Sequence, residues 1–283
     1  MREFLRRAVF AVIAIPIAGV IIWRGGLVLA LMLAALSALA AWEFFRLSAA
    51  GGVHAFGKAG IALAAAIPLV VHFNYAQVTR VPLSAGALVI LALFAGAVWR
   101  RVGERPLSAV GATVFGVLYS GGMITFGYAL RYHPYVIGAA AGTALVGLPL
   151  ILTWSTDTGA YAFGKAFGRT KMMPAVSPGK TWAGAVGGLL LAVVGVGLYV
   201  AFVLRPVADI TLTATGIALY ASLVGVTAQV GDLAESLLKR EAGVKDSSRL
   251  IPGHGGVLDR FDSLLFVLPV SYVLLSELLV PVP

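Results

Sequence analysis

The chain has 283 residues, of which 60% are hydrophobic and only 12% are charged, and its formal net charge is +9. Its mean hydropathy of +0.95 excludes an ordinary soluble domain. The sequence contains no cysteine, which excludes disulfide bonds and thiolate catalysis and leaves the redox compartment open.

Nine apolar runs follow one another along the chain, and each is close to the length that a helix needs to cross a bilayer. In chain order they are Ala8–Trp23, Gly25–Trp42, Ala59–Thr79, Val81–Trp99, Pro106–Leu130, Tyr132–Thr156, Thr181–Leu204, Ile210–Gly231 and the segment that starts at Ser263. The sequence lacks the short alternating segments of a transmembrane β-barrel. We therefore predict an all-α, polytopic integral membrane protein with about nine transmembrane helices. A signal peptide is the alternative for the first run, but eight further runs favour an uncleaved helix.

Lysine and arginine are distributed unevenly over the connections between these runs. If the chain alternates sides, seventeen of the 21 lie on one side, and only Arg24, Arg80, Arg131 and Arg205 lie on the other. The positive-inside rule places the richer side, which includes the N-terminus, in the cytoplasm. The excess of lysine and arginine is therefore explained by the orientation of the chain in the membrane, and we expect no nucleic-acid partner.

The aspartates divide the chain into two regions. Five of them lie in the two longest polar connections, at positions 157, 232, 246, 259 and 262. We predict an N-terminal transmembrane scaffold over residues 1–154. Residues 155–283 are predicted to form a C-terminal catalytic transmembrane region with two cytoplasmic loops.

In the second of these connections, Asp259 and Asp262 are three residues apart at the predicted start of the last helix. This spacing places both carboxylates on one helical face, and Asp232 and Asp246 lie upstream. Magnesium binds one or two carboxylates while substrate phosphates complete its octahedron. The alternative is that these aspartates cap the helix and form ion pairs.

The same connection contains Gly253-His254-Gly255-Gly256. A glycine-rich backbone can approach a ligand closely and present its N–H groups to an anion. The imidazole of His254 is able to donate to a phosphate or bind a metal. An ordinary turn after Pro252 is the alternative.

The first connection contains the sequence SPGKTWAGAVGG, which is not a P-loop because position 174 is proline where that motif needs glycine. Its cations and hydroxyls precede a predicted helix and favour an anionic ligand. They are Lys165, Arg169, Lys171, Lys180, Ser177 and Thr181. Asp157, at the end of an apolar run, is a further candidate for a functional site. A solvated, positive-inside loop is the alternative for the whole segment. Together the two connections indicate chemistry on a phosphorylated lipid with a polyphosphate donor.

These residues resemble the phosphatidate cytidylyltransferases, the CDP-diacylglycerol synthases. From Ser236 the chain reads S-L-L-K-R, four residues, and then K-D-S-S-R-L-I-P-G-H-G-G-V-L-D-R-F-D to Asp262. The first connection matches in Asp157-Thr-Gly-Ala-Tyr161, Gly164-Lys165, Phe167-Gly168-Arg169 and Ser177-Pro-Gly-Lys-Thr-Trp182. It departs at Ala183, where relatives usually carry Glu or Gln. The resemblance covers roughly residues 150–283, and the N-terminal half matches only in hydropathy.

The resemblance implies the reaction CTP + phosphatidate → CDP-diacylglycerol + pyrophosphate, dependent on Mg²⁺ and assisted by K⁺. It also implies a homodimer among membrane lipids, in the inner membrane, with the active site facing the cytoplasm. The implied metal ligands are Asp232, Asp259 and Asp262, and the implied catalytic residues are Lys180, Lys245, Asp246, His254 and Arg260. The implied substrate-binding residues are Asp157, Lys165, Arg169, Ser177, Thr181, Ser247, Gly253, Gly255 and Gly256.

Two other classes of function remain open from the residues. One is a related CTP-using lipid enzyme, either an ether-lipid cytidylyltransferase or a prenol kinase. The other is an ion-coupled transporter, in which buried acids hold the driving ion. Transporters usually place such acids at the middle of the membrane within inverted repeats. Here the acids lie at the ends of the runs and no repeat is visible, so this class is disfavoured.

Overall fold

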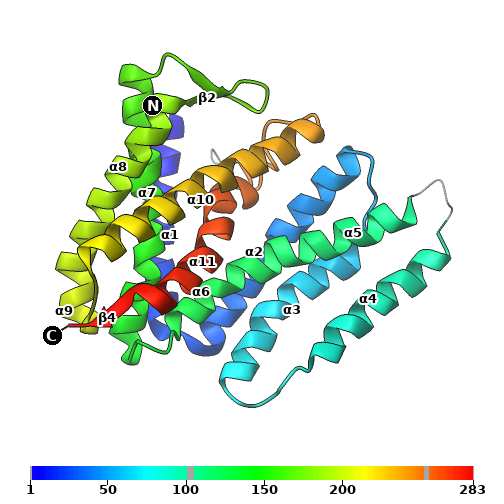
Figure 1. The fold of residues 1–283 in the computed structure, drawn as a ribbon. Coiled ribbons are helices and arrows are strands. Elements are labelled where there is room, and N and C mark those ends of the chain that lie inside the picture. Colours follow the sequence, from blue (N-terminus) through cyan, green and yellow to red (C-terminus); the bar gives the residue numbers. More distant parts are fainter. Residues whose placement is uncertain (1, 101–104, 252–254, 283) are drawn as a thin grey trace. The chain divides into compact units, whose positions relative to one another are not determined.

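The computed structural model describes residues 2–100, 105–251 and 255–282, and these residues are mainly helical (Figure 1). The helices are α1 Arg2–Arg24, α2 Gly26–Ala50, α3 Gly57–Tyr75, α4 Leu83–Val98, α5 Pro106–Val117, α6 Met123–Arg131, α7 Gly138–Phe167, α8 Trp182–Tyr199, α9 Arg205–Ala208, α10 Ala214–Glu241 and α11 Leu258–Leu278. Two π-helical turns, η2 Leu118–Gly122 and η3 Val200–Leu204, join α5 to α6 and α8 to α9. The strands are β1 Lys171–Met173, β2 Ser177–Thr181, β3 Ile210–Leu212 and β4 Leu279–Pro281.

Seven helical stretches among the described residues are long and apolar enough to cross a membrane. They are α2, α3, α5 to α6, α7, α8 to α9, α10 and α11. Two shorter apolar stretches, Val12–Arg24 and Ser84–Val98, coincide with the remaining predicted runs. The predicted class, a helical polytopic membrane protein, is therefore confirmed. The count of nine spans and the side of the N-terminus stay predictions.

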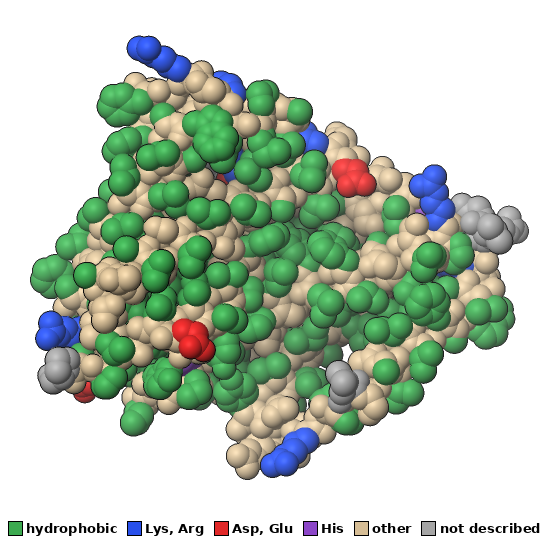
Figure 2. All heavy atoms as spheres, viewed as in Figure 1, with side chains coloured by type: hydrophobic (Ala, Val, Ile, Leu, Met, Phe, Trp, Pro, Cys, Tyr) green, Lys and Arg blue, Asp and Glu red, His purple; other side chains and the backbone are tan. Residues whose placement is uncertain are grey.

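Helix α8 shows how these stretches meet the lipid. Val186, Leu190, Val194, Leu198 and Phe202 recur every four residues along α8 and η3, and each is more than half exposed. Residues four apart lie on one helical face, so they form an apolar stripe that the described residues leave largely uncovered. Hydrophobic side chains are also spread over the whole face shown in Figure 2, where charged side chains are few. Such a surface is stable in hydrocarbon and unfavourable in water.

Several helix ends differ from the ends of the predicted runs, and two of these differences concern the site. Helix α7 continues to Phe167 and α10 continues to Glu241, so Asp157 and Asp232 lie within helices and not in connections. The prediction was wrong here because a change from apolar to polar side chains marks the edge of the membrane. It does not end a helix whose backbone remains hydrogen-bonded.

Short strands also modify the all-α prediction. Strands β1 and β2 form an antiparallel hairpin between α7 and α8, with Lys171 opposite Thr181 and Met173 opposite Ser177. Strands β3 and β4 pair antiparallel over three residues each. The pattern of apolar side chains did not predict these strands, because each is too short to show a period.

The chain forms two compact units. The first contains residues 1–128 and 238–260, and the second contains residues 129–237 and 261–283. In the first unit α2 packs along α3 and against α5 and η2, while α4 packs on α5. In the second unit α7 and α8 run side by side over most of their length (Figure 1). Each unit therefore combines residues from both sides of position 154.

Candidate active site

The hairpin holds the cation-rich motif of the first connection against the start of α8. The Trp182 N–H donates to the Thr170 carbonyl oxygen at 3.1 Å, which closes the hairpin at its base. Thr181 is the N-cap of α8, and its Oγ1 accepts a hydrogen bond from the Gly184 N–H at 3.1 Å. This is the standard way to satisfy one of the free N–H groups at a helix start. The Thr181 side chain is buried, so the structure gives this predicted substrate-binding residue a capping role.

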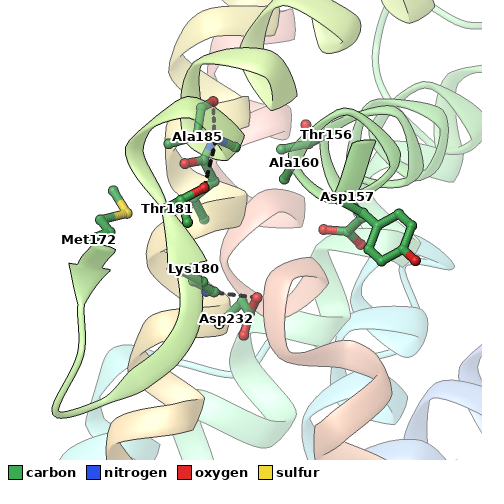
Figure 3. Close-up of a pocket in the computed structure, with 12 residues that line it drawn as sticks. Thr156, Asp157, Ala160, Met172, Lys180, Thr181, Ala185 and Asp232 are labelled. Carbon is green, nitrogen blue, oxygen red and sulfur yellow. Dashed lines mark hydrogen bonds and ion pairs between the residues drawn. The ribbon is translucent and has the colours of Figure 1, made fainter. Parts of the chain in front are cut away.

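A pocket of about 220 Å³ opens between α7, the hairpin and α10 (Figure 3). Its polar lining comes from three of these elements, with Asp157 on α7, Lys180 on β2, and Gln229 and Asp232 on α10. Tyr161 and Met172 contribute apolar surface to the same lining. The pocket thus joins Asp157 and Asp232, which are 75 positions apart in the chain, and both of these aspartates were sequence candidates.

Lys180 and Asp232 form an ion pair inside this pocket. The Lys180 Nζ lies 2.7 Å from the Asp232 Oδ2, and the two side chains are 23% and 36% exposed. In Figure 3 the Asp157 carboxylate points from α7 into the same pocket. The pocket therefore contains one cation, whose ammonium is buried against Asp232, and two carboxylates. These groups are able to bind a phosphate and a divalent cation together.

The other candidates of the first connection lie outside the lining of this pocket. Lys165 and Arg169 are exposed, and the Lys165 ammonium lies 5.9 Å from the centre of the Tyr161 ring. Ser177 begins β2 opposite Met173 and is partly buried. Their predicted contacts with substrate stay predictions.

Asp262 lies next to the α10 residue that precedes Asp232. A Cβ added at Gly231 would be 2.8 Å from the Asp262 carbonyl oxygen, so only glycine allows this close approach of α11 to α10. The Asp262 Oδ1 accepts a hydrogen bond from the Ser263 N–H at 2.6 Å. The structure thus brings Asp262 and Asp232 into neighbouring positions on two packed helices of the second unit.

Asp259 occupies a different environment, within the first unit. Its Oδ1 accepts from the Lys239 Nζ at 2.7 Å, and both side chains of this ion pair are nearly buried. Its Oδ2 accepts from the Ser247 N–H at 2.9 Å, the Ser247 hydroxyl at 2.8 Å and the Gly256 N–H at 2.8 Å. Four donors therefore surround the carboxylate that was predicted to bind metal. Ser247 and Gly256, predicted to bind substrate, are two of the residues that supply them.

The loop before α11 has one further acceptor, Glu43, which sequence reasoning missed. Glu43 lies on α2, more than 200 residues away in the chain, and its side chain is fully buried. Its carboxylate accepts from the Ser247 and Ser248 hydroxyls and from the Val257 and Leu258 N–H groups. The available signal was a lone carboxylate in a long apolar helix, which is a functional candidate by default.

The remaining candidates of the second loop are exposed or lie outside the described residues. Lys245 and Asp246 line an open pocket with Arg46 and Arg249. Arg260 is exposed in the first turn of α11. Gly255 has a φ of +79°, a conformation that favours glycine, and a Cβ there would lie 2.7 Å from the Asp259 Oδ2. Gly253 and His254 lie outside the described residues.

The donor chemistry decides which pocket fits a metal ion. Within the described ranges no three His, Cys, Asp or Glu side chains cluster as a ready metal site. The hairpin pocket offers the oxygens of Asp157 and Asp232 beside open space. That set fits Mg²⁺, which needs only one or two carboxylates when phosphates supply further oxygens. Asp259 offers less, because its oxygens already accept four hydrogen bonds.

Comparison with known proteins identifies similar sequences along the whole chain. Residues 5–278 match the cytidylyltransferase family. The phosphatidate cytidylyltransferase of Pseudomonas aeruginosa is 35% identical over 289 aligned positions, which cover 95% of this chain and 96% of the relative. That of Haemophilus influenzae is 45% identical over 144 residues, 50% of this chain and 48% of the relative. That of Bacillus subtilis is 43% identical over 135 residues, 48% of each.

Proposed function

Because this chain belongs to the cytidylyltransferase family, we propose that it converts CTP and phosphatidate to CDP-diacylglycerol and pyrophosphate. The observation that carries this proposal is the hairpin pocket, where Lys180, Asp157 and Asp232 meet at one end of apolar helices. Cations and carboxylates at the edge of a membrane suit a polyphosphate nucleotide and a lipid phosphate. The name shared by the bacterial relatives supports the same substrates.

The chemistry requires little from the protein beyond positioning and charge neutralisation. A phosphate oxygen of phosphatidate attacks the α-phosphorus of CTP, and the bond from that phosphorus to the β-phosphate oxygen breaks. The electron pair of this bond leaves with pyrophosphate. The attacking phosphate is largely ionised near neutral pH, so no strong general base is needed. Orientation of the two phosphates and stabilisation of the leaving charge then account for most of the acceleration.

Lys180 is the cation best placed for the leaving phosphates. Its ammonium is paired with Asp232 at 2.7 Å. When a triphosphate binds, Lys180 exchanges this carboxylate for phosphate oxygens, and Asp232 becomes available to a cation. The pair therefore keeps both groups in the pocket and neutralises each until substrate arrives.

Mg²⁺ is part of the proposal, with Asp157 and Asp232 as holding residues and Asp262 beside them. When bound, the ion neutralises negative charge on the nucleotide phosphates. Asp259 is proposed to organise the loop before α11, since Lys239, Ser247 and Gly256 already surround it. The assisting K⁺ stays a prediction from the family resemblance.

For the second loop we retain the roles that the family resemblance implies, carried by its exposed charges. Lys245 and Arg260 are accessible cations, and Asp246 lies between Lys245 and the buried serines. Lys165 and Arg169 add positive charge next to the hairpin, and Ser177 adds a hydroxyl within it. His254 and the Gly253 N–H group keep their predicted role as phosphate donors and lie outside the described residues.

The membrane placement follows from charge. We propose nine spans in the inner membrane, an N-terminus in the cytoplasm, and an active site that opens to the same side. The support is the uneven distribution of lysine and arginine over alternate connections. The homodimer implied by the family resemblance is retained as a prediction.

The deciding experiment follows two labels of CTP in detergent micelles that contain phosphatidate and Mg²⁺. A cytidylyltransferase moves the α-phosphate label into the lipid and releases the γ-phosphate label as pyrophosphate. A lipid kinase instead moves the γ label into the lipid and releases CDP. UTP in place of CTP is the matched control for nucleotide selection. Absence of α label in the lipid, with folded protein and Mg²⁺ present, would refute the proposed activity.

A further inference from the structure

Glu43 occupies a site in which all four acceptor positions of a carboxylate are used. Its Oε1 accepts from the Ser248 hydroxyl at 2.6 Å and from the Val257 N–H at 2.9 Å. Its Oε2 accepts from the Ser247 hydroxyl at 3.0 Å and from the Leu258 N–H at 2.7 Å. A carboxylate has about four lone-pair sites and no proton to donate. It is therefore the side chain that matches four converging donors.

The donors come from both ends of the loop that precedes α11. Ser247 and Ser248 directly follow Lys245 and Asp246, while Val257 and Leu258 begin the helix. One side chain from α2 thus closes the loop at residues 247–248 and 257–258. It also supplies negative charge at a helix N-terminus, where the macrodipole favours an anion.

The Ser247 hydroxyl links Glu43 to the second carboxylate of this loop. Its oxygen lies 3.0 Å from Oε2 of Glu43 and 2.8 Å from Oδ2 of Asp259. A hydroxyl has a single proton, so the two carboxylates share one donor. A change at Glu43 therefore alters the hydrogen bonding of Asp259, and through it the contact with Lys239.

Gly256 shows how closely this arrangement is packed. A Cβ at this position would lie 2.5 Å from Oε2 of Glu43 and closer still to Oε1 and to the Ser247 hydroxyl. Contacts below 3 Å require the surrounding atoms to move. Only a residue without a side chain at position 256 therefore leaves room for the Glu43 carboxylate.

We propose that Glu43 is a positioning residue for the transfer reaction: it holds residues 247–248 and 257–258 together and so fixes the adjacent Lys245 and Asp246, which the family resemblance implies as catalytic. This inference rests on the proposed function. It assigns to α2, in the region predicted only as scaffold, an indirect part in catalysis. Glu43 acts through the loop and makes no contact with substrate in this role.

The test compares Glu43→Gln with wild type and with Glu241→Gln, an exposed carboxylate at the end of α10 in the same unit. Glutamine has the same shape, but its NH₂ group faces two donors and repels them. We expect kcat per folded enzyme to fall about 10- to 100-fold, since small misplacements of reacting groups cost this much. The KM for CTP should change less than threefold, and Glu43→Asp should recover part of kcat. Glu241→Gln should match wild type.

A second measurement reports the loop directly. Lys245 and Arg249 are exposed trypsin sites next to the two serines. In Glu43→Gln, trypsin should cut at these residues at least tenfold faster than in wild type, while the thermal midpoint in detergent stays within a few degrees. A purely structural role predicts the reverse, with a lower midpoint and an unchanged kcat for the molecules that remain folded.

Each outcome decides between the two proposals. If wild type transfers no α label, the proposed function fails, while the trypsin comparison still tests the loop. If wild type is active and folded Glu43→Gln keeps normal kcat and normal trypsin resistance, the role of Glu43 is refuted. If Glu43→Gln does not fold, Ser248→Ala removes one of the four hydrogen bonds and leaves the carboxylate in place. A stable Ser248→Ala enzyme with wild-type kcat and trypsin resistance would then overturn the inference.

Discussion

The ion pair between Lys180 and Asp232 gives the sharpest prediction for catalysis. In Lys180→Ala the pocket loses the cation that would bind the phosphates of CTP, and Asp232 loses its partner at 2.7 Å. The substitution also removes a contact that tightens as charge shifts to the leaving pyrophosphate. We therefore expect a loss in kcat at least as large as the rise in KM for CTP.

The magnitude follows from two opposing contributions. A charge-assisted contact with phosphate is worth about 1.5–3 kcal/mol. The ion pair must be broken before that contact forms, and a pair as exposed as this one, at 23% and 36%, is worth about 0.5 kcal/mol. The net loss of about 1–2.5 kcal/mol corresponds to a decrease in kcat/KM for CTP of roughly 5- to 70-fold.

Steady-state kinetics in micelles measures this loss, with CTP and phosphatidate varied separately. Lys171→Ala is the matched control, because Lys171 is an exposed lysine of the same hairpin that does not line the pocket. If Lys180→Ala left both constants within twofold of wild type, Lys180 would serve only the charge asymmetry of the membrane. A rise confined to the KM for phosphatidate would move Lys180 from the nucleotide to the lipid phosphate.

Three further predictions concern topology, metal and pH. A reporter fused after Lys180 should read cytoplasmic and one after Arg205 external, and the same side for both would refute the nine-span arrangement. Asp262→Asn should lose most Mg²⁺-dependent turnover yet remain folded. Asp259→Asn should instead lower the thermal midpoint, because it disturbs a buried ion pair. Equal thermal midpoints of the two variants would contradict this distinction. Burial lowers the pKa of His133 below its usual value of 6.5, so the unfolded chain binds a proton more readily than the folded one. The stability from this residue is therefore complete above pH 6.5 and declines as the pH falls below it. Thermal midpoints of wild type and His133→Asn should converge under acid conditions, and parallel curves would contradict this expectation.

Hydropathy and charge were enough to predict the class of this protein and the positions of its helices. Each apolar run by itself indicates a membrane-spanning helix. A helix in hydrocarbon must form all its backbone hydrogen bonds internally and present apolar side chains to the lipid. The motif around Lys180 was also found locally, since its cations and hydroxyls are adjacent in the chain. Helix ends were less well predicted, as the continuation of α7 beyond Asp157 shows.

The partners of the charged groups were decided only by the tertiary structure. Asp259 looked like a metal ligand from its spacing to Asp262, but its carboxylate accepts from Lys239, Ser247 and Gly256. The ion pair between Lys180 and Asp232 joins the hairpin to α10, and the two residues are 52 positions apart in the chain. Neither arrangement has a periodic signal, because each depends on how separate helices pack.

Glu43 shows the same limit most clearly. Its sequence context is an apolar helix, and its four donors lie more than 200 residues away. A local pattern records which face of a helix is buried, but it carries no information on which distant backbone N–H groups will meet a buried carboxylate. The sequence by itself determined the membrane class and the reactive motifs. The close packing of α2 against the loop before α11 decided how those motifs are held, since a buried charge is stable only where folding brings enough donors to it.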